Sequence, residues 1–313
     1  MLPVAGAGVS ARVERGIVDV TARLGYQSLD TIGTGMVVDG SGEVLTNNHV
    51  IRGATSIRVS DLDNGRTYAA VVVGYDVSAD VAVLRLEDAS GVQSVTLGSS
   101  SNAKAGDAVT TIGNAGGDGG TPRRTTGEVL ALDRSITALD DSGNLERLTG
   151  LIEMSAPLKP GDSRGPLVDA AGEVIGMDTA GSGQQSNNDG FAIPINRVLS
   201  VANRIERGQS SATVHVGKTA FIGVNIESPG HDSGAPVVGA LVTGTLSGGP
   251  ASRAGIVRGD IIYAVQGRTI ASPAALTSTL SRLSPGTTTR LAWIDQAGKT
   301  HRAEVRLESG PPQ

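Results

Sequence analysis

The sequence predicts a mainly β protein with two domains, and three observations support this prediction. Valine, isoleucine and leucine occur in short runs between clusters of glycine, asparagine and serine, which is typical of many short strands. Aromatic residues make up only 2% of the chain, whereas glycines number 44. The hydrophobic period changes near residue 195, and a second patterned region follows. We therefore expect a first domain over residues 9–208, a linker over 209–217 and a second domain over 218–308.

The first domain begins with residues 9–21, which alternate loosely and are expected to form a short helix or an arm. A hairpin follows, because residues 35–38 and 43–46 are apolar runs on either side of a Gly-Ser-Gly turn. Residues 98–106 are small and polar and are expected to connect two sets of strands. Apolar runs predict the remaining strands at 57–59, 68–74, 80–86, 109–112, 128–132, 151–154, 166–168, 174–177 and 191–193.

A helix is expected to close the first domain. Ile195, Val198, Leu199, Ala202 and Ile205 recur at helical spacing, and a glycine at position 208 is placed to end the helix. The second domain mixes strands at 221–226, 237–242, 260–265, 291–294 and 303–307 with short helices after residues 250 and 272. Its second helix is predicted by a serine cap followed by proline.

Composition excludes several classes of function. The net charge of −5 and the pI near 5.4 leave no basic footprint, so we expect no nucleic-acid partner. The chain has no cysteine, and its four histidines show no metal-binding spacing, so no metal site is expected. Neither Gly33-Thr34-Gly35 nor the run 113–120 has the context of a nucleotide loop, and no cofactor is expected. No apolar stretch of about 20 residues predicts a membrane span, and the first residues do not resemble a signal peptide.

One hexapeptide is a candidate for nucleophilic chemistry: Gly161-Asp162-Ser163-Arg164-Gly165-Pro166. Glycines allow the backbone to adopt conformations that other residues avoid, so the Ser163 hydroxyl could be exposed beside backbone N–H groups. Acyl transfer needs a nucleophile next to donors for a developing oxyanion. A simple surface turn would explain the hexapeptide equally well.

A histidine and a carboxylate complete the candidate constellation. His49 directly follows an apolar strand of the same domain, although a lone histidine in such a place is usually structural. Asp80 opens an apolar run, where a buried carboxylate needs a partner; Asp76 is the rival, and its polar surroundings suggest that it is solvated. The order His49, Asp80, Ser163 is that of chymotrypsin-like proteases.

Several motifs in this order resemble the HtrA/Deg family of serine proteases. They are 46–51 (TNNHVI), 80–84 (DVAVL), 161–163 (GDS), 190–194 (GFAIP), 221–224 (FIGV), 249–251 (GPA) and 259–262 (GDII). The resemblance covers residues 30–308 and is greatest to actinobacterial members of the family. It implies two six-stranded β-barrels of the chymotrypsin-like kind, followed by a PDZ domain.

The resemblance also implies roles for individual residues. Ser163 would be the nucleophile, His49 the general base and then acid, and Asp80 the group that orients His49. The backbone N–H groups of Gly161 and Ser163 would form the oxyanion hole. The segment Thr179, Ala180, Gly181 would pair with the substrate backbone.

In the PDZ domain, the resemblance implies that Ile222, Gly223 and Val224, preceded by Phe221, would bind a C-terminal carboxylate. The peptide would add as a strand beside Val224 and Ile226. The helix face with Leu276 and Leu280 would wall the groove, or these leucines would simply belong to the core.

The chain departs from the family pattern at Arg164, where the family has glycine after the nucleophile. If this position needs a positive φ, a side chain costs roughly 1–2 kcal/mol, so an impaired or latent protease-like scaffold is the alternative to an active enzyme. Expected partners are unfolded protein or peptide substrates and C-terminal peptides. Because no acidic residue clearly supplies a pocket for basic side chains, cleavage after small or medium apolar residues is expected. The family resemblance implies an extracytoplasmic location and a possible homo-trimer.

Overall fold

We describe the protein from a computed structural model. The structure describes residues 15–114, 122–139, 145–156, 165–181, 189–229 and 238–313. The chain divides after Val216 into two compact units, which are treated separately below. Within the described part of the chain, no helix has the length and apolar character that crossing a membrane requires.

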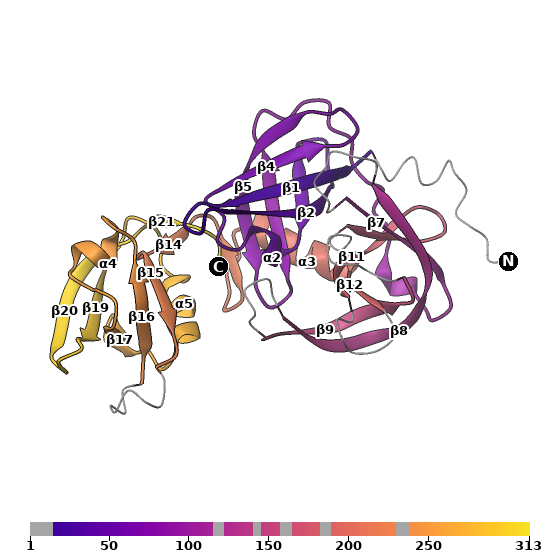
Figure 1. The fold of residues 1–313 in the computed structure, drawn as a ribbon. Coiled ribbons are helices and arrows are strands. Elements are labelled where there is room, and N and C mark those ends of the chain that lie inside the picture. Colours follow the sequence, from indigo (N-terminus) through magenta and orange to yellow (C-terminus); the bar gives the residue numbers. More distant parts are fainter. Residues whose placement is uncertain (1–14, 115–121, 140–144, 157–164, 182–188, 230–237) are drawn as a thin grey trace. The chain divides into compact units, whose positions relative to one another are not determined.

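Six antiparallel strands of the first unit form a closed ring, the first barrel (Figure 1). Neighbours in the order β5-β4-β1-β2-β3-β6 are hydrogen-bonded, and pairing of β5 with β6 closes the ring. Its interior is packed with small β-branched and aliphatic side chains such as Val18, Val20 and Val59. The strands are β1 (Ile17–Leu24), β2 (Leu29–Val37), β3 (Glu43–Thr46), β4 (Ser56–Asp61), β5 (Thr67–Asp76) and β6 (Val81–Leu86).

A second closed barrel follows, with the strand order β10-β11-β12-β9-β8-β7. Its interior holds aliphatic side chains that include Ile152, Leu167 and Ala192. A short 3-10 helix, η1 (Ser100–Asn102), lies in the connection between the barrels. The strands are β7 (Ala108–Gly113), β8 (Arg123–Leu139), β9 (Leu145–Met154), β10 (Pro166–Val168), β11 (Val174–Gly181) and β12 (Gly190–Pro194).

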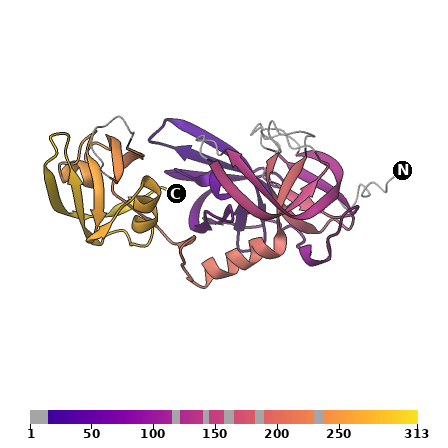
Figure 2. The same cartoon turned by 90° about the horizontal axis from the view of Figure 1, so that it is seen from below.

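The barrels pack against each other through a shared apolar cluster with residues from both, such as Leu45 and Val83 from the first and Met177 and Ile193 from the second. Helix α3 (Ile195–Glu206) contributes the buried side of its amphipathic surface to this cluster. The helix packs on β5 and β6 of the first barrel and on β11 and β12 of the second. Figure 2 shows α3 lying lengthwise along the two barrels. The prediction of two six-stranded barrels is therefore confirmed.

The second unit is built on an antiparallel sheet with the strand order β15-β16-β17-β19-β20, and β18 pairs with β17. A separate two-stranded sheet joins β14 and β21. The strands are β14 (Thr219–Phe221), β15 (Val224–Glu227), β16 (Ala240–Thr245), β17 (Ile261–Val265), β18 (Arg268–Thr269), β19 (Thr288–Ile294), β20 (Thr300–Arg306) and β21 (Glu308–Gly310). The helices are α4 (Pro250–Arg253) and α5 (Pro273–Leu280). The hydroxyl of Ser272 caps α5 by accepting a hydrogen bond from the Ala275 N–H, as its sequence predicts.

Two local predictions differ from the structure. The expected short helix or arm at 9–21 is wrong where the structure describes it, because β1 begins at Ile17 and both faces of this strand are largely buried. From Val18 to Leu24 apolar and polar residues alternate, which is the pattern of a strand. The expected linker at 209–217 contains the strand β13 (Val214–Val216), which pairs with β5 and extends the first barrel's sheet.

Candidate active site

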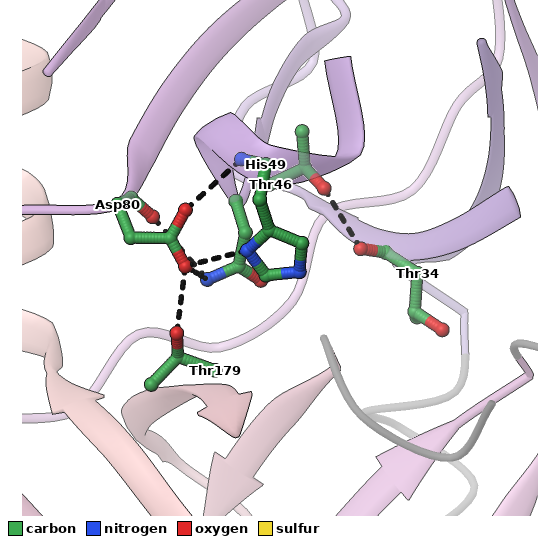
Figure 3. Close-up of polar contacts among 6 residues, drawn as sticks. Thr34, Thr46, His49, Asp80 and Thr179 are labelled. Atoms are coloured by element: carbon green, nitrogen blue, oxygen red, sulfur yellow. Dashed lines mark hydrogen bonds and ion pairs between the residues drawn. The ribbon is translucent and has the colours of Figure 1, made fainter. Parts of the chain in front are cut away.

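The centre of the site is the carboxylate of Asp80, which accepts four hydrogen bonds from the side chain or backbone of three residues (Figure 3). His49 donates through its ring Nδ1 to Oδ2 at 2.8 Å and through its backbone N–H to Oδ1 at 3.0 Å. Asn47 donates its amide to Oδ2 at 3.0 Å, and the Thr179 hydroxyl donates to the same oxygen at 2.6 Å. The structure thus brings together His49 and Asp80, which the sequence had paired.

These residues come from both barrels. β3 ends at Thr46, Asn47 is the N-cap of the short helix α2 (Asn48–Ile51), and His49 lies within that helix. Asp80 precedes β6 of the first barrel, while Thr179 lies on β11 of the second. Asp80 has a φ of 53°, a left-handed conformation that is uncommon outside glycine. Asn47 also donates to the Asp80 carbonyl oxygen at 3.2 Å, and so supports both the backbone and the side chain in this conformation.

The electrostatics of the site favour an ionised Asp80. The residue is only 1% exposed, and burial alone would raise the pKa of its carboxyl. The positive charge that His49 can carry and the hydrogen bonds from His49 and Thr179 outweigh burial, and they hold the pKa of Asp80 below its ordinary value. A buried carboxylate that stays charged beside an imidazole can fix the ring orientation and stabilise the imidazolium form.

A second set of buried hydrogen bonds joins the barrels near this cluster. Asn114, which follows β7, donates its side-chain amide to Asp19 Oδ2 at 2.9 Å and its backbone N–H to the Thr34 hydroxyl at 3.0 Å. Thr46 donates its hydroxyl to the Thr34 carbonyl oxygen at 2.9 Å. Through Thr34, the end of β3, which leads to His49, is therefore linked by hydrogen bonds to the end of β7 in the second barrel.

The candidate nucleophile and oxyanion residues Gly161 and Ser163, with Asp162 and Arg164, lie outside the described residues. The hexapeptide is described from Gly165 onward. Gly165 is buried, and its carbonyl oxygen accepts a hydrogen bond from the Asp178 N–H at 2.9 Å. A Cβ at this position would lie 1.6 Å from the Ile112 carbonyl oxygen, so only glycine fits where the hexapeptide meets β7.

The expected substrate segment Thr179, Ala180, Gly181 forms the end of β11. On one side it pairs with β12, whereas the pairing of β11 with β10 ends at Met177. Among the described residues, no strand pairs with the other edge of 179–181. Its backbone can therefore accept an added strand, while the Thr179 side chain is bonded to Asp80.

In the second unit, the residues expected to bind peptide fall into two groups. Gly223 has a φ of 77°, and its carbonyl oxygen accepts a hydrogen bond from Leu246, which fixes the turn before β15. β15 is an edge strand, since β16 is its only partner among the described strands. Phe221, Val224 and Ile226 are half-buried, whereas Ile222, Leu276 and Leu280 are buried in the core. The structure thus favours the core interpretation of the two leucines.

Sequence reasoning missed two features of the site. It did not single out Asn47, although an amide two residues before a candidate histidine is a usable signal. It also expected Asp76 to be solvated, which is wrong: Asp76 is 4% exposed and accepts hydrogen bonds from Ser78, Ala79 and Thr213. The Asp-x-Ser pattern of such a turn was present in the sequence. Within the described part of the chain, no cluster of three or more His, Asp or Glu residues could hold a metal ion.

Both domains of the chain match known protein families. Residues 33–177 match the trypsin-like peptidase domain, and residues 220–307 match the PDZ domain. Serine protease PepD of Mycobacterium tuberculosis is 31% identical over 319 residues, which cover 96% of this chain and 65% of that protein. The periplasmic pH-dependent serine endoprotease DegQ of Escherichia coli is 32% identical over 296 residues, which cover 90% of this chain and 60% of DegQ. The chain thus spans less than two thirds of the length of these curated relatives.

Solved structures give the same result over the whole chain. The HtrA-type protease AlgW with tripeptide has a TM-score of 0.57 and 28% identity, with 99% of each chain covered. AlgW with decapeptide has a TM-score of 0.56 and 26% identity, with 99% of this chain and 100% of that chain covered. With its two barrels, its PDZ sheet and these relatives, the chain belongs to the HtrA family of serine proteases, in which a trypsin-like domain precedes a PDZ domain.

Proposed function

We propose that the protein is a serine endopeptidase that cleaves unfolded or misfolded polypeptides. The observation that carries this proposal is the buried carboxylate of Asp80, which receives both the ring and the backbone N–H of His49. A buried carboxylate stabilises a fold no better than an apolar residue of similar size, whereas it can orient an imidazole for proton transfer. Membership of the HtrA family of serine proteases indicates the type of reaction, which is hydrolysis of a peptide bond.

In the proposed mechanism, His49 takes the proton of the Ser163 hydroxyl as the serine oxygen attacks the substrate carbonyl carbon. Asp80 holds the Nδ1 proton, so the other ring nitrogen carries no proton before the attack, and the negative charge of Asp80 stabilises the imidazolium that forms. The N–H groups of Gly161 and Ser163 stabilise the oxyanion, each contributing roughly 10²–10³ in rate. His49 then gives its proton to the leaving amine, and water completes the cycle by hydrolysing the acyl-enzyme.

Two backbone edges are proposed to bind peptides. The open edge of Thr179–Gly181 would pair with the extended substrate, which selects for unfolded chains because folded proteins offer few free strands. In the PDZ domain, the turn at Ile222–Val224 would bind a C-terminal carboxylate, and the peptide would pair with the open edge of β15. The structures of AlgW with a tripeptide and with a decapeptide support peptide binding in this family.

We further propose an extracytoplasmic location, because relatives such as DegQ are periplasmic. A homo-trimer is also proposed, on the basis of the family resemblance. Size-exclusion chromatography with light scattering measures the mass in solution, and a monomeric mass would reject the trimer.

The central experiment combines substrate degradation with active-site labelling. The full chain is expected to degrade unfolded casein and to react at Ser163 with a fluorophosphonate probe. Ser163→Ala should abolish both reactions without changing the circular dichroism spectrum. A chain that degrades no casein and takes up no label is not a working protease.

Arg164 favours a second candidate, a latent or impaired protease-like scaffold that binds peptides. If Arg164 keeps the protein latent, Arg164→Gly should raise the rate of fluorophosphonate labelling sharply. If the protein is already an active enzyme, the substitution is not needed for labelling. An equal labelling rate for the two chains would reject latency caused by Arg164.

A further inference from the structure

Asp178 is a buried carboxyl residue that the proposed mechanism does not use. Its exposed fraction is 0%, and neither carboxyl oxygen has a hydrogen-bond partner among the described residues. The other buried aspartates differ, since each accepts at least one hydrogen bond; they are Asp19, Asp61, Asp76, Asp80 and Asp260. Burial raises the pKa of Asp178 well above its ordinary value, which favours the protonated form of the group. Buried polar groups are normally paired, and this exception calls for a functional explanation.

The strand places this carboxyl directly behind the catalytic cluster. Asp178 and Thr179 are neighbours on β11, but the pairing with β12 shifts register between Asp178 and Ala180, so Thr179 is an extra residue there and simple alternation does not apply. The Thr179 hydroxyl points to Asp80. Asp178 instead pairs with Ala192, which lies in the interior cluster of the second barrel, so Asp178 faces that interior at the end of β11 that reaches the catalytic cluster.

Its cross-strand neighbours are small or apolar. Asp178 pairs with Ala192 of β12, which in turn pairs with Ile152 of β9. Both neighbours belong to the apolar interior cluster of the second barrel. Further along, β12 has Gly190, which pairs with Gly181 and has no side chain. Other members of this cluster, such as Met154 and Leu167, are apolar as well.

We propose that Asp178 is a specificity-determining residue that binds the cationic head of a Lys or Arg side chain on the acyl side of the cleaved bond. The proposal rests on the proposed function, because it needs a substrate strand on the open edge of Thr179–Gly181. Side chains of that added strand alternate between the two faces of the sheet, and one of them would point into the barrel beside Asp178. The sequence had led us to expect a small or medium apolar substrate residue before the cleaved bond, because no acidic residue clearly lined its pocket. A role for Asp178 replaces that expectation.

Binding of a cation changes the proton balance of the site. In the free protein burial favours the neutral carboxylic acid, whereas in the proposed complex the carboxylate is paired with an ammonium or guanidinium group. Each cation that binds at the neutral acid therefore releases one proton to the solvent. Below the raised pKa, affinity for a cation should increase about tenfold per pH unit, which no neutral ligand would show.

The test uses benzamidine, a small planar cation that resembles the head of arginine, and benzyl alcohol as its neutral counterpart. Both are titrated calorimetrically into the full chain carrying Ser163→Ala, at about pH 6, 7 and 8 and in two buffers of different ionisation enthalpy. Benzamidine is expected to bind at least about tenfold more tightly than benzyl alcohol and more tightly as the pH rises, as pairing with a buried carboxylate requires. The Ser163→Ala chain, which retains Asp178, should release about one proton for each benzamidine molecule that binds. This result tests the proposal even if a variant at Asp178 does not fold.

Adding Asp178→Asn keeps the size of the side chain but removes its ionisation. This variant should bind benzamidine at least about tenfold more weakly and release no proton. Asp63→Asn, at an exposed aspartate of the first barrel, is the matched control and should change neither result. If benzamidine does not bind, or binds the Asp178→Asn variant equally well, the proposal is overturned.

These outcomes are independent of proteolysis. Cation binding that depends on Asp178, in a chain that labels with no fluorophosphonate, would support the pocket and reject the proposed function. Conversely, casein degradation without Asp178-dependent binding would support the enzyme and reject the specificity. If peptides are cleaved, the ratio of kcat/KM for Lys over norleucine at the cleavage site should fall at least about tenfold in Asp178→Asn.

Discussion

Glu43 on β3 provides a quantitative link between protonation and stability. Its side chain is 7% exposed and lies 3.1 Å from the Arg85 guanidinium, which is also 3.9 Å from Glu206 at the end of α3. Burial raises the pKa of Glu43 most, and the hydrogen bond and charge of Glu206 and the charge of Asp39 raise it further. Arg85 opposes these effects only in part, and the pKa is raised to about 8.

The sign of the pH dependence follows from this shift. An unfolded glutamate titrates near 4.5, so between pH 4.5 and about 8 the folded chain binds one proton more than the unfolded chain. The free energy of unfolding therefore falls as the pH rises through this window, by at most about 1.36 kcal/mol per pH unit for this group. From pH 5 to 8 the ceiling is about 4 kcal/mol, and solvent screening at the half-exposed Glu206 and Arg85 side chains reduces our expectation to about 2 kcal/mol.

Glu43→Gln removes the titration while keeping the size of the side chain. Urea denaturation of wild type and variant at about pH 5, 6, 7, 8 and 9 measures the effect. The variant should gain about 2 kcal/mol relative to wild type between pH 5 and 8 and little more above that. Glu87→Gln, at an exposed glutamate, is the control and should follow wild type. Parallel curves for wild type and Glu43→Gln would refute the reasoning.

Three further substitutions test the site. Thr179→Val removes a hydroxyl donor to Asp80 worth roughly 1.5–3 kcal/mol, so kcat/KM should fall at least about tenfold and the acid loss of activity should move to higher pH; an unchanged pH profile would contradict this. Asn47→Leu keeps the volume but removes the amide that supports Asp80, and fluorophosphonate labelling should slow about tenfold; an equal labelling rate would show that the amide is dispensable. Gly165→Ala forces a clash with Ile112 and should lower the melting temperature strongly, whereas Gly40→Ala, which has open space around it, should not; equal melting temperatures would argue against the close approach.

Much of the architecture could be predicted from the sequence because it depends on local patterns. Short apolar runs predicted most strands, and the helical spacing predicted α3 to within a residue. The strand β1 was missed although Val18, Val20, Ala22 and Leu24 alternate with polar residues; the segment expected at 9–21 ended inside this alternation. β13 was missed because three residues are too few to show a period, and its pairing with β5 depends on contacts distant in sequence.

The candidate site could be predicted only in part, for a similar reason. Asp80 was identified because a carboxylate opening an apolar run needs a partner, and the structure places His49 beside it. Nothing local to Thr179 shows that its hydroxyl reaches a carboxylate 99 residues earlier in the chain. Asp178 was not identified from the sequence, because a single aspartate in an apolar strand does not reveal whether its side chain faces the barrel interior or the solvent.

The hydrogen bond from Thr179 to Asp80 means that neither barrel contains a complete orienting cluster. A chain cut in the exposed connection near η1 would give two fragments, one with His49 and Asp80 and the other with Thr179 and Ser163. The first fragment would keep the hydrogen bonds of Asn47 and His49 to Asp80 but lose the one from Thr179, and the proposed nucleophile would lie on the other fragment. Proteolysis by the proposed mechanism would therefore require the two halves to associate. The architecture is therefore suited to a split-protein reporter, in which proteolysis would measure the encounter of two fused partners.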